Sequence, residues 1–186
     1  MSKKIEPISK EIKLSFKKYI VSKTNLKGVI IYANDYFTEI SKYNEVELIG
    51  SPHNILRHPD MPSIIFKLIW NSIEKGRHIS AIIKNRTKDD DYYWIRAEFE
   101  IQKDIKGNIK NYIAYRQAVP KKVIKEIEPL YKKLLDIEKA HGINESLEYL
   151  TGFLEEKDMS YQQYINNLAE PKGIHAKLFK TMKKLF

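Results

Sequence analysis

The sequence of 186 residues predicts an α+β fold, in which a five-stranded antiparallel sheet carries helices on one face and is followed by an all-helical extension. Two observations lead to this prediction. Residues 19–118 change pattern every few residues, with two strand-like segments before a set of helices and three after it. From Pro120 onward every segment has helical spacing. The predicted boundaries are 1–18 for an N-terminal cap segment, 19–119 for the sheet domain and 120–186 for the extension.

The first half of the sheet domain is predicted to contain two strands and several helices. YIVSKTNLKGVIIYAN has the pattern of two strands joined by a turn, in which Gly28 supplies the unusual backbone angle. DYFTEISKY places Tyr36, Phe37 and Ile40 on one helical face, and NEVELIG predicts another brief helix. The longest helix of this domain is predicted in MPSIIFKLIWNSIEKG, where five residues recur at helical spacing: Ile65, Phe66, Ile69, Trp70 and Ile73.

The second half is predicted to contain three antiparallel strands. ISAIIKNR is separated by the polar turn TKDDD from YYWIRAEFEI, whose residues alternate between two faces. One face of this strand is apolar, and the other carries Tyr92, Trp94 and Arg96. DIKGN then turns the chain into IKNYIAYRQA. Such a sheet leaves a pocket between its inner face and the helices, which is a common position for a small molecule.

The extension is predicted to contain four helical segments. Pro129 predicts a kink or a break in the first, and the next two are predicted to begin at Asn144 and Asp158, which are common N-cap residues. The last segment, GIHAKLFKTMKKLF, is a basic amphipathic helix. We favour packing on its own domain or on a partner protein over contact with an anionic membrane. Its predicted apolar face is formed by Ile174, Leu178, Met182 and Leu185, flanked by Phe179 and Phe186.

Composition excludes several classes of protein. The sequence has no cysteine, which excludes disulfides, thiolate zinc sites and cysteine nucleophiles. No apolar run is long enough to span a bilayer and MSKKIEPISKEIK lacks a signal-peptide core, so we expect a cytoplasmic protein. The net charge is +9, but the lysines are scattered without a recognition motif, so we expect no nucleic-acid partner. No kinase, cyclase or phosphodiesterase motif occurs, and we expect no enzymatic activity.

The loop GSPHNILRHPDMP, residues 50–62, combines rigid and titratable side chains and has three interpretations. In the first, prolines stiffen the loop and Asp60 caps the helix that follows. In the second, His53, His58 and Asp60 bind a metal, although the prolines do not suit a regular set of ligands. In the third, Arg57 and His58 bind an anionic group such as a pyrophosphate, because they lie just before a helix N-terminus.

Several motifs together resemble the PAS domains of the aerotaxis receptor family. YANDYF, PHNILRHPDMP, LIWNSIEKG, IKNRTKDDDYYWIRA and YIAYR are followed by IEPLYKKLL, and the resemblance extends over residues 19–135. It implies a non-enzymatic energy sensor that binds FAD and signals to a membrane-anchored chemotaxis protein. The layout is closer to the stand-alone PAS protein of a two-protein energy-taxis system, held at the inner face of the membrane through its partner. The sheet and the extension are both candidate surfaces for a homodimer.

The resemblance also implies which residues hold the cofactor. The family's Arg-His-x-Asp residues match Arg57, His58 and Asp60, and they are implicated in cofactor binding. This assignment favours the anion-binding interpretation of the loop over a purely structural one.

Four further residues are candidates for contact with the flavin. Asn85 is expected to line the pocket, where its amide can pair with the donors and acceptors of the flavin edge. Asn34 opens a helix, so it serves either as a cap or as a flavin contact. Phe66 and Trp70 are core residues that also form a wall of the cofactor site. Ile79 stands where flavin-binding relatives commonly carry a tryptophan, which leaves a second interpretation: a PAS interaction module that binds haem, another small ligand or no cofactor.

Overall fold

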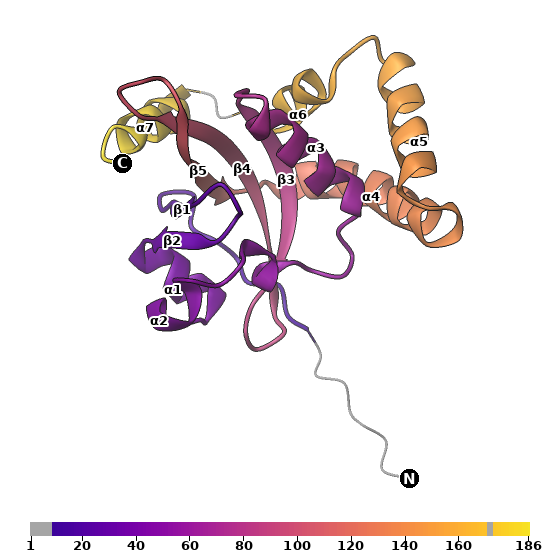
Figure 1. Ribbon diagram of the computed structural model, residues 1–186. Helices are drawn as coiled ribbons and strands as arrows, with labels where there is room; N and C mark the ends of the chain where they lie inside the picture. Colours follow the sequence, from indigo (N-terminus) through magenta and orange to yellow (C-terminus); the bar gives the residue numbers. More distant parts are fainter. Residues whose placement is uncertain (1–8, 171–172) are drawn as a thin grey trace.

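The computed structural model describes residues 9–170 and 173–186 and shows one antiparallel sheet with the strand order β2-β1-β5-β4-β3 (Figure 1). All five predicted strands are present, so the predicted fold class is confirmed. The first eight residues of the predicted cap segment lie outside the described residues. The strands are β1 (Ile20–Thr24), β2 (Ile30–Ala33), β3 (Ile79–Arg86), β4 (Tyr92–Lys103) and β5 (Ile109–Ala118).

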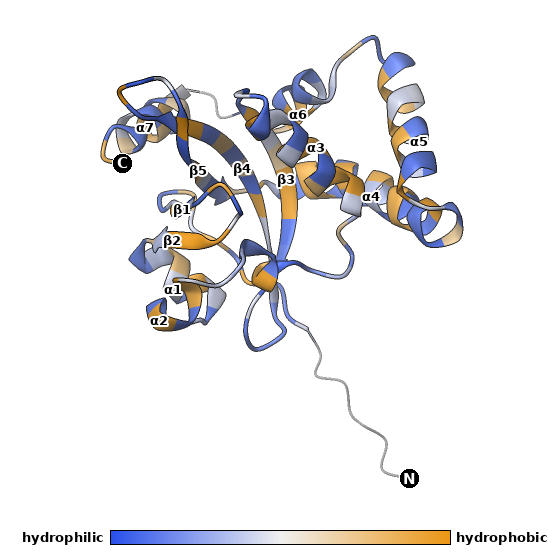
Figure 2. Ribbon diagram, viewed as in Figure 1, coloured by the Kyte–Doolittle hydropathy of each residue, from blue (hydrophilic) through white to orange (hydrophobic). Residues whose placement is uncertain are grey.

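The inner face of the sheet packs against the helices between β2 and β3. The longest of them, α3, buries an apolar stripe against this face because Ile65, Ile69 and Ile73 recur at helical spacing, and this stripe forms the main core. Figure 2 shows the apolar residues along β3 beside this helix. The helices of this layer are α1 (Asp35–Ser41), α2 (Glu45–Leu48), a short 3-10 helix (His53–Leu56) and α3 (Ser63–Glu74).

Helices of the C-terminal extension cover the outer face of the sheet, the face turned away from α3, whereas α5 packs on α4 and α3. Trp94 on this face stacks on Tyr131 of α4 with ring centroids 6.4 Å apart, and Arg96 donates to Asn166 of α6 at 3.4 Å. These contacts leave Trp94 and Arg96 only 5% and 4% exposed. The sequence predicted which residues lie on this face, but it did not predict that the extension would bury them. The helices are α4 (Lys121–His141), α5 (Ile143–Glu155), α6 (Tyr161–Ala169) and α7 (Gly173–Lys183).

The last helix, α7, packs on its own domain, on the outer face of β1 and β5 (Figure 1). The side of the helix that makes this contact overlaps in part with the predicted one, because Met182 of the predicted apolar face packs here together with Phe179 and Phe186. Phe179 is buried in a small cluster with Val21, Ile113 and Tyr115, whereas Ile174 is 74% exposed. The physical reason is that Tyr19 and Tyr115 form an aromatic surface on the sheet, against which the Phe179 ring packs better than an aliphatic side chain of α7 would.

Two predictions about helix starts were wrong, and one helix shows no break at its proline. The helix α4 continues through Pro129, so the kink-or-break prediction is not met by a break; Pro129 and Lys125 both face solvent, and water can bond the carbonyl that the proline leaves unpaired. The helix α5 begins after Gly142 rather than at Asn144. The N-cap of α6 is Ser160, whose side chain accepts the Gln163 N–H in a capping box, rather than Asp158.

The extension also covers part of the free edge formed by β3. An edge strand exposes backbone groups that would otherwise pair with another chain. Here Gln162 of α6 accepts the Ser80 N–H at 2.7 Å, and the Tyr131 hydroxyl of α4 donates to the Ile82 carbonyl at 2.7 Å. Side chains of the extension therefore cover one part of this edge, and Arg57 in the loop before α3 forms a backbone bridge with Asn85 at another.

Candidate functional site

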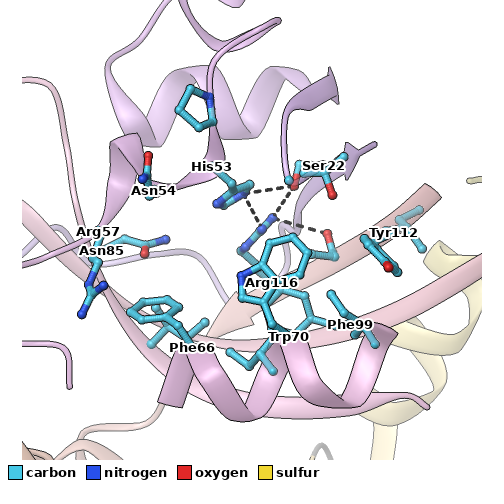
Figure 3. A pocket seen from close by; sticks show the side chains of 18 of the residues that line it. Ser22, His53, Asn54, Arg57, Phe66, Trp70, Asn85, Phe99, Tyr112 and Arg116 are labelled. Atoms are coloured by element: carbon cyan, nitrogen blue, oxygen red, sulfur yellow. Dashed lines mark hydrogen bonds between the residues drawn. The ribbon is translucent and has the colours of Figure 1, made fainter. Parts of the chain in front are cut away.

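A cavity of about 380 Å³ lies between α3 and the inner face of the sheet. Phe66 and Trp70 of α3 form one wall, and Figure 3 shows both rings directed toward the sheet. Ile83 and Phe99 contribute apolar surface from the sheet itself. The volume and the apolar lining are typical of sites for small molecules.

The turn between β1 and β2 closes one side of the cavity against Trp70. Gly28 in this turn has a φ of 77°, and a Cβ atom placed on it would lie 2.8 Å from the indole ring. No ordinary side chain fits at that distance, so glycine serves both the turn and the close approach. The predicted turn is confirmed, and the structure adds its contact with the cavity wall.

The central polar group of the cavity is Arg116 of β5, which sequence reasoning missed. Its guanidinium donates to Ser22 Oγ at 2.9 Å and to His53 Nε2 at 2.7 Å (Figure 3). The residue is 2% exposed, and no carboxylate of residues 9–170 or 173–186 forms an ion pair with it. Burial lowers the pKa of Arg116 to about 10, which still leaves it cationic at neutral pH.

His53 is the neutral partner of this cation. Burial, followed by the positive charge of Arg116, lowers the pKa of His53 to about 3. A guanidinium can only donate, so Nε2 of the neutral ring accepts and the ring proton is on Nδ1. The ring also stacks on Phe37 with centroids 5.9 Å apart. His53 therefore stabilises a buried positive charge without neutralising it.

Four of the predicted residues line the cavity: Arg57, Phe66, Trp70 and Asn85. Arg57 donates to Ser63 Oγ at 2.7 Å and to the Met61 carbonyl at 3.2 Å, and its guanidinium lies 4.7 Å from the centre of the Phe66 ring. Figure 3 places Arg57 and Asn85 at one end of the cavity, with Arg116 in its middle.

Among the residues that the structure describes, the Asn85 amide has one weak partner. Asn85 is 5% exposed, and its Nδ2 atom lies 3.5 Å from the Tyr93 hydroxyl. This separation is at the long limit for a hydrogen bond, so most of the pairing capacity of the amide is free to face the cavity.

The other three predicted residues are not among those that line the cavity. Asn34 is tied to the fold, because its Oδ1 accepts the N–H groups of Val21 at 2.9 Å and Phe37 at 3.2 Å. Its predicted role as a helix cap is confirmed. His58 and Asp60 lie on the side of β3 that faces α4.

Asp60 and His58 belong to a charged group beside a second cavity of about 320 Å³ against α4. Asp60 pairs with Lys84 at 2.6 Å, and its backbone N–H donates to His58 Nδ1 at 3.1 Å. Partial burial opposes the ionisation of Asp60, but the hydrogen bond and charge of Lys84 outweigh it and lower the pKa. Burial and the charge of Lys84 lower the pKa of His58.

The predicted cap of α3 by Asp60 was wrong. The helix begins at Ser63, and Glu138 of α4 accepts the N–H groups of Ser63 at 2.7 Å and Ile64 at 2.8 Å. Asp60 is held away by Lys84, whereas α4 runs past the helix end and supplies a carboxylate where the first turn needs one.

Residues 9–170 and 173–186 contain no group of three or more histidine, aspartate or glutamate side chains placed to hold a metal ion. Within the same ranges, no helix has the length and apolar character that crossing a membrane requires. His53 and His58 make separate contacts, with Arg116 and with Asp60 respectively.

Ile79, the position where the sequence resemblance led us to expect a tryptophan, is buried at the start of β3 and is not among the residues that line the cavity. The signal for Arg116 was present in the sequence and was overlooked. In IKNYIAYRQA, Arg116 shares the inward parity of Tyr112 and Ala114, so a cation stands where the strand should be apolar. His53 carried a weaker signal, because among the three interpretations of its loop this residue entered only the metal-binding one.

Comparison with known proteins identifies the fold and its relatives. Residues 30–116 match the family model described as PAS fold. The aerotaxis receptor of Escherichia coli strain K12 is 42% identical over 115 residues, which are 62% of this chain and 22% of the receptor. The biofilm dispersion protein BdlA of Pseudomonas aeruginosa is 26% identical over 54% of this chain and 24% of that protein. The chain thus spans less than a quarter of the length of these relatives.

Solved structures show the same fold. A light-oxygen-voltage domain studied with a flavin analogue is 21% identical, with a TM-score of 0.53 over 59% of this chain and 82% of that domain. The PAS domain of a Colwellia psychrerythraea protein is also 21% identical, with a TM-score of 0.51 over 57% of this chain and 89% of that domain. At these identities the likeness concerns the fold alone.

Proposed function

Because the chain contains a PAS domain similar to that of the aerotaxis receptor, we propose that it is a redox sensor that holds FAD in the cavity beneath α3. The observation that carries this proposal is Arg116, a buried cation without a carboxylate partner among the described residues. A buried charge of this kind is costly unless a ligand compensates it. The carbonyl edge of a flavin ring that lies against the wall of Phe66 and Trp70 would offer such compensation.

The residues of the cavity fit the separate parts of FAD. Phe66 and Trp70 would cover one face of the flat ring, while Arg116 and the underused amide of Asn85 would bind its polar edge. Arg57, Lys27 and Lys67 also line the cavity and would supply positive charge for the pyrophosphate. When bound, the flavin supplies reversible reduction. The fixed charge of Arg116 would favour the more negative, reduced form of the ring.

The haem alternative has less support from these residues. A haem iron needs an axial ligand, and the histidine of this cavity already accepts a hydrogen bond from Arg116 at Nε2. If His53 Nε2 bound the iron, Arg116 would lose this hydrogen bond and gain no partner in its place. A PAS module with another small ligand, or with none, stays the second candidate because Ile79 replaces the tryptophan common in flavin-binding relatives.

His58, Asp60 and Asn34 would act indirectly in this proposal. The ion pair of Asp60 with Lys84 would hold the loop that carries Arg57, and His58 would support it by accepting the Asp60 N–H. Asn34 would fix β1 against α1, and β1 provides Ser22 for the pair with Arg116. Their replacement is expected to lower FAD content through the shape of the site.

The proposed output is protein contact rather than catalysis. Residues 19–119 would form the sensor, and 120–186 would serve signalling or docking to a membrane-anchored chemoreceptor-type protein in energy taxis. The protein would then work in the cytoplasm, at the inner face of the membrane through this partner. A homodimer through the sheet or the extension is part of the same proposal, and no nucleic acid is required.

Replacement of Arg57 by alanine tests the cofactor site. The change should remove one charge-assisted contact to phosphate, which costs about 1.5–3 kcal/mol of binding free energy. Purified Arg57→Ala protein should therefore contain much less flavin, while its circular dichroism stays close to wild type. Asp104→Ala, in the exposed turn between β4 and β5, is the control that should keep its flavin. Full occupancy in a folded Arg57→Ala protein contradicts the assignment.

A further inference from the structure

We propose that Glu138 of α4 is a positioning residue for the cavity, through which the C-terminal extension and the bound ligand stabilise each other. The inference rests on the proposed function, because FAD is the ligand used to test it. It assigns to the extension a direct part in forming the binding site.

Glu138 holds the end of α3 that carries the cavity wall. Its two carboxylate oxygens accept the N–H groups of Ser63 at 2.7 Å and Ile64 at 2.8 Å. The residue at the N-cap position, Pro62, makes no side-chain cap bond. These two amides therefore depend on a carboxylate that lies 74 and 75 residues away in the chain. A negative charge at a helix N-terminus also interacts favourably with the helix dipole.

The same turn of α3 is bonded to the cavity through Arg57. Arg57 donates to Ser63 Oγ at 2.7 Å and lies over the Phe66 ring at 4.7 Å. Ser63 thus receives Arg57 at its side chain while its backbone N–H is bound by Glu138. Phe66 follows three positions later and lines the cavity. The carboxylate of the extension, the first turn of α3 and a cavity-lining cation form one contiguous set of contacts.

The coupling must act in both directions. If Glu138 keeps the first turn of α3 in the geometry that presents Arg57 and Phe66, it raises the affinity for the ligand. By thermodynamic linkage, the ligand must then favour the docking of α4 by the same factor. A change at the cavity would in this way reach the extension through α3, without passing across the sheet.

Two variants and a matched control test the proposal by titration of FAD into apo protein. Glu138→Ala should weaken FAD binding by about tenfold, within the usual range of coupling between sites. Glu138→Gln should lie between this variant and wild type, because its amide oxygen still accepts one N–H. The control, Ser160→Ala, removes a cap from α6 at a similar cost in stability and should leave the affinity unchanged within about twofold.

Hydrogen exchange gives a readout that a loss of stability alone would not produce. Addition of FAD should slow exchange in residues 121–141 of wild type and Ser160→Ala, and this slowing should be absent in Glu138→Ala. Equal FAD affinity in folded Glu138→Ala and wild type would overturn the coupling. If wild type binds no FAD, the proposed function fails. Unchanged exchange of the Ser63 and Ile64 amides in apo Glu138→Ala would refute the positioning role by itself.

Discussion

Replacement of Arg116 by methionine should separate the stability of the protein from its ability to bind FAD. The substitution keeps an unbranched apolar chain and removes the buried charge. Burial lowers the pKa of this arginine from its ordinary value to about 10, which corresponds to a cost of about 3 kcal/mol for keeping the charge in the folded protein. Its bonds to Ser22 and His53 return about 1 kcal/mol each.

The two terms nearly cancel, so Arg116→Met should leave the free energy of unfolding within about 2 kcal/mol of wild type. The partners left behind can also bond each other, because Ser22 Oγ lies 3.4 Å from His53 Nε2. The affinity for FAD should behave differently. Loss of a charge-assisted contact to the ring should weaken binding by about 10- to 100-fold.

Urea unfolding of the apo protein and FAD titration are the two assays. Arg96→Met is the matched control, because Arg96 is also buried but pairs with Glu98 at 3.2 Å on the outer face. This control should lose about 2 kcal/mol of stability and keep its FAD affinity. The reasoning is refuted if Arg116→Met binds FAD as tightly as wild type, or if it loses more than about 4 kcal/mol of stability.

Three further predictions follow from single contacts. The pKa of His53 is lowered to about 3, so its unfolded form binds more protons below pH 6.5 and stability should fall as the pH drops. Between pH 7 and pH 5, wild type should lose about 2 kcal/mol more unfolding free energy than His53→Gln. An equal pH dependence in both proteins contradicts this prediction. Gly28→Ala should destabilise the protein more than Gly107→Ala, because both glycines have a positive φ but only a Cβ at position 28 would meet Trp70. Equal urea midpoints for the two variants would show that the contact with Trp70 has no effect on stability. Deletion of 172–186 should lower the free energy of unfolding by about 3 kcal/mol, because the apolar contacts of α7 are lost. It should leave flavin content intact, because no residue of α7 lines the cavity; loss of flavin would show that the tail belongs to the site.

The sheet and the main helix were predictable because each is encoded locally. The alternation in YYWIRAEFEI and the apolar stripe of Ile65, Ile69 and Ile73 identify their own elements, and Gly28 identifies its turn. The four predicted residues that line the cavity were found through resemblance and through their position on these elements.

The missed features depend on partners that lie far away in the sequence. Glu138 caps a helix 75 residues before it, and nothing in the pattern of α4 marks that carboxylate as a cap. Asp60 has the right residue type and place for the cap, but Lys84 holds it elsewhere. The extension was correctly predicted as helices, but an amphipathic pattern does not indicate which surface of the protein a helix will cover. This is why Phe179 rather than Leu178 became the buried contact of α7.

The central claim is that the cavity around Arg116 holds a flavin, and the absorption spectrum of the purified protein tests it most directly. We predict the paired absorption bands of an oxidised flavin, bleaching on addition of dithionite, and release of FAD on denaturation. A Soret band would instead indicate haem. A spectrum without either feature, unchanged after incubation with FAD, would contradict the account.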